Sequence, residues 1–454
     1  MDHPDEIIIS ETESVCPVCF ARLPASVIRR GDSVFMRKAC AQHGEFLTLL
    51  WRGDPPYEAW SRPKIPFQSP CPKTEVASGC PFDCGLCSDH RQQTCTALLE
   101  VTTRCNLRCA FCFADSGGTR QLDPDLTEIR AWYETLLENG YVCNVQLSGG
   151  EPTLRDDLPE IVALGRSMGF EFIQLNTNGL RLASDPEYLE RLKEAGLSSV
   201  FLQFDGTENE IHRVLRGGNF LDSKVQSIDN CRQMELGVVL VPTLVSGVNV
   251  QNVGEIISFA LENLPTVRGV HFQPVTYVGR YPGMPDEEER LTLPEVMRAI
   301  ESHSRGLIRV ENFAPPGCEN ALCSFHGSFV VMPDGQVKAL TNCREERCSC
   351  KSEKAEAGAA RTRQCVAEQW SASNTLLCGS AHDHISMGQW GVLLERARTH
   401  RLSISAMAFQ DAWNLDLDRL RDCCIHVVTE DGTVVPFCAY NLTSIAGRSL
   451  YRRN

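Results

Sequence analysis

Three cysteines near residue 110 have the spacing of an iron–sulfur ligand set. They are Cys105, Cys109 and Cys112, separated by three and two residues, with Phe111 before the last. Thiolates at this spacing can hold one [4Fe–4S] cluster and leave its fourth iron without a protein ligand. An iron with a vacant position can bind a small molecule and pass it one electron. The alternative is a structural zinc site, which requires a fourth protein ligand nearby.

Further motifs follow these cysteines at intervals of about a strand and a helix. They are Ser148-Gly149-Gly150-Glu151-Pro152, Asn176-Thr177-Asn178-Gly179 and Gln203-Phe204-Asp205-Gly206. Together with the cysteine spacing, this series resembles the radical SAM superfamily. The resemblance implies that S-adenosylmethionine (SAM) chelates the open iron and is cleaved reductively to a 5′-deoxyadenosyl radical.

The polar residues and glycines of these motifs are expected to bind SAM. They are Gly149, Gly150, Glu151, Asn176, Asn178 and Asp205. The glycines let the backbone approach a ligand closely, and Glu151 can accept a hydrogen bond from the SAM amino group. The two asparagines could reach the sulfonium or the ribose, or could serve only the turn that an Asn-Gly pair favours. Asp205 is expected to contact ribose or substrate, and Arg213 and Arg216 either reach an anionic group or lie on the surface. No catalytic residue is assigned beyond the cluster ligands.

A second set of cysteines with the same spacing lies upstream. It comprises Cys80, Cys84 and Cys87, with Cys95 as a fourth thiol. The later set follows an apolar run at residues 97–102 that has the character of a first barrel strand, so the later set is expected to bind the SAM cluster. Four thiols would close the coordination of a cluster at the earlier set, and residues 71–95 are therefore interpreted as an auxiliary iron–sulfur segment. A zinc site is the alternative, and Cys71 or His90 could replace one ligand.

Residues 96–280 alternate between apolar runs and amphipathic segments. Strands are expected at 97–102, 142–147, 170–176, 199–205, 238–245 and 267–274, and helices at 125–140, 156–168, 187–195, 223–236 and 253–264. Strand–helix units in this order favour a parallel sheet with right-handed crossovers. The sequence therefore predicts an α/β fold, a partial (β/α)6 TIM barrel of radical SAM type. In such barrels the chemistry lies at the C-terminal ends of the strands, where each motif falls.

Residues 1–70 are expected to form a small metal-binding module followed by a linker. Two pairs of potential ligands, Cys16 with Cys19 and Cys40 with His43, are separated by a predicted hairpin. This pattern is typical of a zinc ribbon or a rubredoxin-like iron site. A closed site that stabilises the module is favoured over an electron relay.

The C-terminal region, residues 281–454, carries a further set of cysteines. Those expected to hold another auxiliary [4Fe–4S] cluster are Cys318, Cys323, Cys423 and Cys438. Cys424 is the alternative to Cys423, because neighbouring side chains of an extended segment point to opposite faces. Buried free thiols are the alternative to a cluster. A stretch rich in Lys, Glu, Ala and Ser at about residues 340–390 is interpreted as a flexible insertion, and it contains Cys343, Cys348, Cys350, Cys365 and Cys378.

The overall composition agrees with an intracellular metal protein. The chain of 454 residues has 23 cysteines, and several stand close together, which suits metal thiolate sites better than disulfides. Its first residues are polar and acidic, so no secretory signal is expected and the protein is expected in the cytoplasm. A formal charge of -14 argues against a broad nucleic-acid surface, and no stretch has the character of a membrane span.

A narrower set of motifs points to one family. The segments are SVCPVC (14–19), GCPFDCGLC (79–87), CAFCFADS (109–116), FQDAWN (409–414) and FCAYN (437–441). They resemble the archaeal tetraether lipid synthase family, which also includes radical SAM methylases proposed to act on a methanopterin precursor. The resemblance implies a rubredoxin-like N-terminal site, a SAM cluster in a partial barrel, further [4Fe–4S] clusters and an electron donor such as ferredoxin or flavodoxin. The cysteine-bearing stretch after Gly335 departs from the family pattern.

The expected reaction is C-methylation or C–C bond formation at an unactivated carbon of a small molecule, either pterin-like or a lipid. A lipid would require a long apolar tunnel, whereas a flat polar substrate would require a compact pocket with amide and carboxylate partners. Two other interpretations stand beside this one. A radical SAM maturase that modifies a peptide would need an open edge strand or groove. A non-catalytic iron–sulfur or zinc protein in a complex would not bind SAM.

Overall fold

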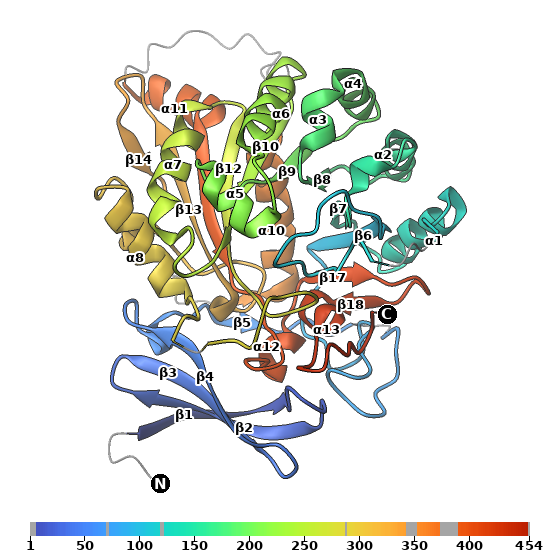
Figure 1. Cartoon of the computed structure of the whole chain (residues 1–454), viewed down its shortest axis with the longest axis vertical. Helices are drawn as coiled ribbons and strands as arrows, with labels where there is room; N and C mark the ends of the chain where they lie inside the picture. Colours follow the sequence, from blue (N-terminus) through green and yellow to red (C-terminus); the bar gives the residue numbers. More distant parts are fainter. Residues whose placement is uncertain are drawn as a thin grey trace.

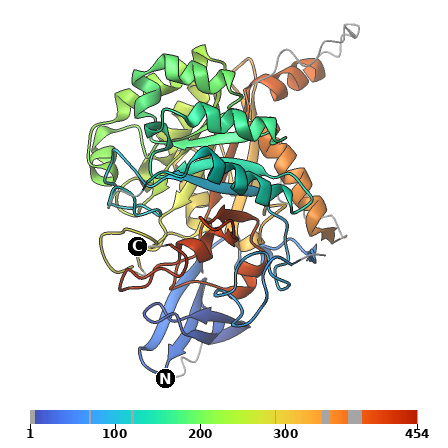
Figure 2. The same cartoon turned by 90° about the vertical axis from the view of Figure 1, so that its right-hand side faces the viewer.

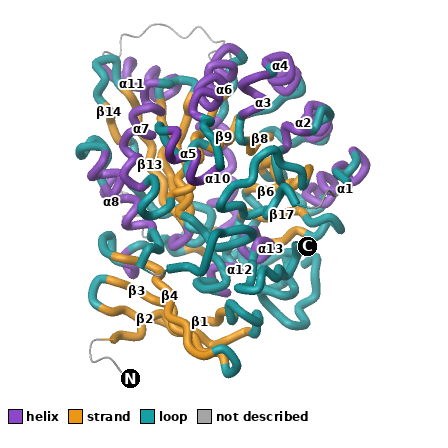
Figure 3. The backbone as a smooth tube through the Cα atoms, viewed as in Figure 1, coloured by secondary structure: helices purple, strands orange, loops and turns teal. Residues whose placement is uncertain are grey.

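The chain forms a large curved sheet flanked by helices, with a small sheet below it (Figure 1). The structure is a computed structural model and describes residues 6–69, 72–118, 122–286, 288–341, 352–372 and 389–452. Loops fill much of the region between the two sheets (Figure 3).

Parallel strands in chain order form the centre of the large sheet. They are β6 (Thr96–Thr102), β7 (Asn144–Gly149), β8 (Ile173–Thr177), β9 (Ser199–Gln203), β10 (Gly237–Val241) and β12 (Val267–Pro274). Each pairs in parallel with the next. The connecting helices are α1 (Leu126–Leu137), α2 (Leu158–Ser167), α3 (Leu180–Ser184), α4 (Pro186–Glu194), α5 (Asn209–Arg216), α6 (Leu221–Gln233) and α7 (Val253–Glu262), and several of them stack along one side in Figure 2. The predicted partial (β/α)6 barrel is confirmed.

Local sequence signals fix the turns between these strands and helices. The side chain of Asp125 accepts hydrogen bonds from the backbone of Thr127 and Glu128, and Glu128 returns one, which is a capping box at the start of α1. Helix α5 ends at Gly217, whose φ of 85° is the left-handed conformation that favours glycine. Every residue of β10 is buried, as expected for a central parallel strand covered on both faces.

The C-terminal region extends both edges of the barrel sheet. At one edge β16 (Arg401–Met407) pairs in parallel with β12, and antiparallel β13 (Ser324–Val331) and β14 (Val337–Ala339) follow. At the other edge β17 (Ile425–Val428) pairs in parallel with β6 and antiparallel with β18 (Val434–Pro436). The C-terminal region, which the sequence places after the barrel, therefore completes the barrel wall.

Helix α10 (Ala355–Trp370) lies in the stretch that the sequence analysis interprets as a flexible insertion. It packs against β10, β12 and β16. A Cβ atom on Gly358 would lie 2.5 Å from the carbonyl oxygen of Gly317, so a small residue allows this close contact. The expectation of flexibility is wrong for this helix. Cys365 lies on α10, whereas the insertion's other cysteines lie outside the described residues: Cys343, Cys348, Cys350 and Cys378.

The N-terminal sheet is an antiparallel meander, drawn in blue in Figure 1. Its strands are β1 (Glu6–Val15), β2 (Arg22–Arg30), β3 (Ser33–Cys40) and β4 (Gly44–Arg52). The hairpin between β2 and β3 agrees with the prediction. Lys38 ties this sheet to the rest of the chain, because its buried ammonium donates to Ser14 Oγ (2.9 Å) and to the carbonyl oxygen of Ala412 (2.8 Å).

Shorter strands and further helices complete the fold. They are β5 (Lys64–Ile65) paired with β15 (Glu353–Lys354), the short β11 (Thr243–Leu244), and α8 (Leu293–His303), α11 (Gln389–Thr399), α12 (Leu417–Arg421) and α13 (Phe437–Asn441). Within the described ranges, every helix is too short or too polar to cross a lipid bilayer.

Candidate active site

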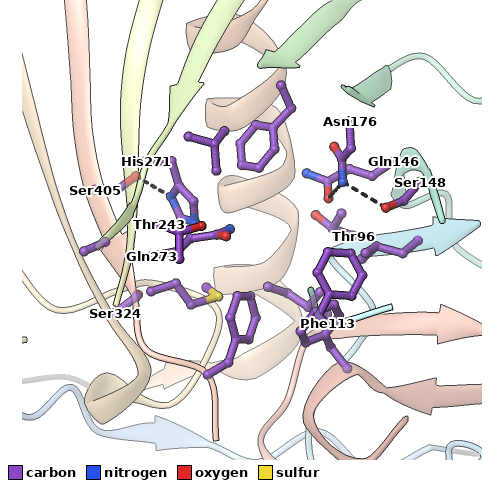
Figure 4. A pocket seen from close by; sticks show the side chains of 18 of the residues that line it. Thr96, Phe113, Gln146, Ser148, Asn176, Thr243, His271, Gln273, Ser324 and Ser405 are labelled. Carbon is purple, nitrogen blue, oxygen red and sulfur yellow. Dashed lines mark hydrogen bonds between the residues drawn. The ribbon is translucent and has the colours of Figure 1, made fainter. Parts of the chain in front are cut away.

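A cavity of about 670 Å³ lies inside the open barrel. Its walls come from the loops after β6, β7 and β8, from the strands between β9 and β16, and from α10 (Figure 4). This volume lies in the range of small-molecule sites. The cavity therefore joins the motif loops at one side to the C-terminal elements at the other.

The loop with the first cysteine motif forms one side of the cavity. Cys105, Cys109 and Cys112 all line it, and burial raises the pKa of Cys105 to about 11. Arg280 Nε donates to the carbonyl oxygen of Cys109 (3.0 Å), and Arg216 Nη1 donates to that of Phe111 (3.2 Å). Three thiols on one loop, facing a cavity and held by two arginines, fit a [4Fe–4S] cluster with one open iron.

Gly149 and Gly150 lie where two backbone segments touch. A Cβ atom on Gly149 would lie 2.2 Å from the carbonyl oxygen of Thr102, and one on Gly150 would lie 2.1 Å from that of Arg104. Gly149 also has a φ of 119°. The sequence analysis expects these glycines to admit a ligand, and the structure adds that they admit the backbone at the start of the cysteine loop.

Glu151 joins the loops after β7 and β8. Its buried carboxylate accepts hydrogen bonds from Thr177 Oγ1 (2.6 Å) and the backbone nitrogen of Asn178 (2.7 Å), as well as from Thr153. Asn178 in turn donates through Nδ2 to Asn106 Oδ1 (2.7 Å) in the cysteine loop. Both Glu151 and Asn178 line the cavity. The arrangement places a carboxylate beside the three thiols and holds the loops around it in register.

Asp205 differs from the expected ligand contact. It is fully buried, and Arg216 Nε and Nη2 each donate to its carboxylate at 2.7 Å. Although burial alone would raise it, the charge of Arg216 holds the pKa of Asp205 below its usual value. Arg216 lines the cavity, whereas Asp205 does not. Asp205 therefore orients Arg216, and Arg213 lies exposed beside Glu210.

Polar side chains from the strands point into the cavity, as Figure 4 shows. Asn176 Nδ2 donates to Gln146 Oε1 (3.3 Å) and Ser148 Oγ (3.4 Å), and its buried Oδ1 has no hydrogen-bond partner among the described residues. On the facing wall, His271 Nδ1 lies 2.8 Å from Ser405 Oγ. Sequence reasoning missed most of these residues. A polar residue at every second position of a strand, such as Gln146 and Ser148, is the signal that could have found them.

Aromatic rings lie next to these polar groups. The ring centroids of Phe201 and Trp370 are 5.6 Å apart, and that of His271 is 5.5 Å from Phe201. Burial lowers the pKa of His271 to about 4, so its imidazole is neutral at pH 7. Lys224, also missed, lies fully buried behind this wall and donates to Gln203 Oε1 (3.1 Å). Flat apolar surfaces and amide groups together suit a planar polar molecule.

The remaining cysteines group differently from the expectation. Cys95 and Cys318 form a disulfide, and the sulfur of Cys424 lies within 4.8 Å of both. The sequence predicts Cys95 with the Cys80 set and Cys318 with Cys323, but each of the two instead lies beside the other and Cys424. The reason is strand pairing: the nitrogen of Cys95 donates to the carbonyl oxygen of Cys424 at 2.8 Å where β6 meets β17.

Two further thiol groups remain. The thiols of Cys80, Cys84 and Cys87 are near enough to affect one another, and the influence of Cys84 raises the pKa of Cys80 to about 11. Cys323, Cys423 and Cys438 lie close enough to influence one another, and burial raises the pKa of Cys438 to about 12. Cys423 and Cys424 face different groups, because adjacent residues of an extended segment point to opposite faces. Arg419 Nη2 donates to Cys323 Sγ at 3.3 Å.

The N-terminal ligand set is brought together as predicted. The ligand atoms of Cys16, Cys19, Cys40 and His43 all lie within 4.8 Å of one another. The sulfurs of Cys19 and Cys40 are 4.0 Å apart, and His43 Nδ1 is 3.4 Å from Cys40 Sγ. Hydrogen bonds from the backbone of Gln42 and from His43 lower the pKa of Cys40 to about 6. These separations fit a tetrahedral site with metal–sulfur bonds of about 2.3 Å.

Comparisons with known proteins agree with this geometry. Residues 99–260 match the radical SAM superfamily, and residues 8–52 match the HMPTM N-terminal zinc ribbon domain. The chain is 34% identical to the 7,8-dihydro-6-hydroxymethylpterin dimethyltransferase of Methanocaldococcus jannaschii, over 95% of this chain and 93% of that protein. It is 30% identical to the GTP 3′,8-cyclase of Listeria welshimeri over 40% of this chain and 55% of that protein, so it spans about half of that relative.

Among solved structures, SuiB of Streptococcus suis bound to the precursor peptide SuiA is similar, with a TM-score of 0.39 and 17% identity over 48% of this chain and 46% of that chain. The M. jannaschii relative shows the family, because the likeness covers nearly the whole of both chains. The chain belongs to the family of the 7,8-dihydro-6-hydroxymethylpterin dimethyltransferase of M. jannaschii, and it is a radical SAM enzyme that uses SAM and a [4Fe–4S] cluster.

Proposed function

We propose that the enzyme C-methylates a dihydropterin-like small molecule at an unactivated carbon. The observation that carries this proposal is the likeness, over nearly the whole of both chains, to a protein named for dimethylation of 7,8-dihydro-6-hydroxymethylpterin. The cavity supports it, because a space of about 670 Å³ with amide and aromatic walls suits a flat polar ring. The amide, imidazole and hydroxyl groups along the strands give a polar ring partners that a lipid chain would not use, and methylation of a pterin is therefore preferred over lipid coupling.

Cys105, Cys109 and Cys112 would hold the SAM cluster. When bound there, the cluster supplies the electron that cleaves SAM to methionine and a 5′-deoxyadenosyl radical. Glu151 would accept a hydrogen bond from the amino group of SAM, since its Oε2 atom accepts one hydrogen bond from the protein and has capacity for another. Arg216, oriented by Asp205, would hold the cysteine loop in place.

The strand side chains would bind the substrate ring. The unpartnered Oδ1 of Asn176 is an acceptor for a ring N–H or amino group, and the neighbouring amides offer both donors and acceptors. Stacking against Phe201 and Trp370 would fix the plane of the ring and exclude water from the radical.

The other thiol groups are proposed as metal sites. Cys80, Cys84 and Cys87 would hold one auxiliary [4Fe–4S] cluster. A second would use thiols from two further groups, which are Cys95, Cys318 and Cys424 in one and Cys323, Cys423 and Cys438 in the other. Cys95 and Cys318 could bind metal only after their disulfide is reduced. Cys16, Cys19, Cys40 and His43 would hold zinc or mononuclear iron and stabilise residues 1–70. A ferredoxin or flavodoxin would deliver electrons in the cytoplasm, where thiols stay reduced.

The test is an anaerobic assay of reconstituted, reduced enzyme with 7,8-dihydro-6-hydroxymethylpterin and excess SAM. The methyl carbon would come from a second molecule of SAM or, in a parallel assay, from an added one-carbon donor of the reduced folate class, because the SAM that yields 5′-deoxyadenosine leaves its methyl group on methionine. We expect 5′-deoxyadenosine, which carries the hydrogen taken from the pterin, and a pterin whose mass rises by one or two CH2 units. We expect neither product from a Cys105→Ala, Cys109→Ala, Cys112→Ala variant. Cleavage of SAM without a methylated pterin would refute the substrate and leave the radical chemistry standing. A peptide substrate would then be the next candidate.

A further inference from the structure

The end of the cavity formed by β13 and β16 has an unusual polar lining. Along these strands, polar side chains occupy every second position and alternate with buried apolar residues or glycine. The polar residues are Ser324, His326 and Ser328 on β13, and Arg401, Ser403 and Ser405 on β16. All of them line the cavity. Alternation with a period of two places them on one face of the sheet.

These residues form a connected surface of hydrogen-bond donors. The strands pair in antiparallel register, with Ser328 opposite Ser403 and His326 opposite Ser405. Arg401 Nε donates to Ser328 Oγ at 2.5 Å, which orients the guanidinium. Its two Nη groups remain available to a ligand. Serine side chains are short, so this wall leaves room in front of the guanidinium for another group.

The charge of this wall is not balanced within the described residues. No described carboxylate lies within ion-pair distance of Arg401, and burial holds the pKa of Arg401 below its usual value. Arg62 and Arg361 line the same end of the cavity. Arg361 is paired with Glu353, whereas among the described residues Arg401 has only the longer-range attraction of Glu368 on α10 and no ion pair. Burial, with the arginines nearby, lowers the pKa of His326 to about 4, so the imidazole is neutral at pH 7.

We propose that this end of the cavity binds a phosphoryl group carried by the substrate. The proposal rests on the proposed function, in which the substrate ring lies between the SAM side of the cavity and this wall. A hydroxymethyl arm on the ring could carry a phosphate or diphosphate ester toward Arg401. A forked guanidinium flanked by hydroxyl groups matches the several oxygens of a phosphoryl group. Partial burial of a guanidinium without an ion-pair partner costs free energy through desolvation, and an anionic ligand would offset that cost.

The first experiment measures anion binding without any pterin. Inorganic pyrophosphate is titrated calorimetrically into the holoenzyme with SAM, using wild type, Arg401→Gln and Arg232→Gln. Arg232 is the matched control, because it lies exposed on α6 and bonds to Asn263 (2.7 Å). We expect Arg401→Gln to weaken binding about tenfold or more and Arg232→Gln to leave it unchanged. No binding by the wild type, or equal binding by the two variants, would overturn the proposal.

Ser403→Ala is a second variant in case Arg401→Gln does not fold. It removes one hydroxyl donor without adding bulk, and we expect pyrophosphate binding to weaken about threefold to tenfold. Unchanged binding by a folded Ser403→Ala variant, together with loss of folding in Arg401→Gln, would count against the site.

The second experiment compares 7,8-dihydro-6-hydroxymethylpterin with its phosphate and diphosphate esters as substrates. We expect a lower KM for an ester in the wild type and a smaller difference in Arg401→Gln. Methylation of all forms with one KM would overturn this inference and leave the proposed function intact. Pyrophosphate binding that depends on Arg401, without methylation of any pterin, would support the anion site and refute the proposed function. Stimulation of the unesterified substrate by free pyrophosphate would assign the site to a free anion and overturn the proposal.

Discussion

The two sides of the cavity are built in different ways. The SAM side consists of short loops after β6, β7 and β8, and each functional residue stands next to others of the same motif. The substrate side consists of strands β12, β13 and β16 and helix α10, whose residues come from distant parts of the chain. On the SAM side, backbone segments of neighbouring loops contact each other directly, as Gly150 does with the carbonyl group of Arg104. On the second side, side chains of alternate positions form the surface.

This difference has a chemical meaning. The SAM side must hold a cofactor and a common cosubstrate, so the loops fix one geometry through backbone contacts and buried hydrogen bonds. The substrate side must match one molecule, and strand side chains can change without disturbing the strand pairing. We expect mutations on the SAM side to abolish radical formation and mutations on the substrate side to change affinity and selectivity.

Loss of a cluster ligand should give the largest effect. In a Cys109→Ala variant we expect SAM cleavage to fall by more than the roughly 10- to 100-fold that loss of an outer-shell partner costs a metal site. The control is Cys231→Ala, a core thiol buried on α6 away from the cavity. Release of 5′-deoxyadenosine and iron content are measured together. Full cleavage activity in Cys109→Ala would contradict the role of the SAM side.

The next effect tests the backbone contact beneath the cysteine loop. In Gly150→Ala the new methyl group would meet the carbonyl oxygen of Arg104, and we expect a loss of about 1 to 3 kcal/mol in stability. Cluster incorporation should fall with it, because the loop is displaced. Gly118→Ala is the control, since nothing lies within 4 Å of its Cβ position. The thermal unfolding temperature and the cluster absorbance of the two variants are compared. Equal values in both would contradict a tight backbone contact at Gly150.

The SAM side could be predicted from the sequence and the substrate side could not. Cys105 stands in one short motif and Gly150 and Glu151 in another, and each motif follows a strand of the predicted barrel, so the parallel order of the strands is enough to group them. His271 and Ser405 meet only because β16 returns to pair with β12. That pairing depends on long-range packing, which local periodicity does not report.

The thiol groups give the same lesson. Cys80, Cys84 and Cys87 are neighbours in sequence, and their association was predictable. Cys95 and Cys424 meet because β17 pairs with β6 at the edge of the barrel sheet, and this association was not predictable from their positions in the sequence. The same is true of α10, because its composition suggests a polar insertion while its glycine and alanines allow close packing.

A pH-dependent effect of intermediate size separates a buried histidine of the substrate side from an exposed one. Burial lowers the pKa of His271 to about 4, below its unfolded value of about 6.5. The unfolded chain therefore binds more protons between these values, so stability is present above pH 6.5 and is lost as the pH falls toward 4. At pH 5 the loss is about 2 kcal/mol.

The measurement compares unfolding free energies at pH 7.5 and pH 5. We expect His271→Gln to lose less stability on acidification than wild type by about that amount. His303→Gln is the control, because His303 is exposed at the end of α8. We expect this variant to lose as much unfolding free energy between pH 7.5 and pH 5 as wild type. Equal pH dependence in both variants would show that His271 is not held neutral by burial.

The smallest effect should come from a single amide of the substrate side. Gln273 points into the cavity from β12 (Figure 4), and Gln273→Leu keeps most of its volume while removing its hydrogen-bonding amide group. We expect KM for the pterin to rise about tenfold, which corresponds to about 1.4 kcal/mol, with a smaller change in kcat. Gln251→Leu on the outer surface is the matched control. An equal fall in SAM cleavage without substrate would mean that Gln273 acts on the SAM side, and the division between the two sides of the cavity would not hold.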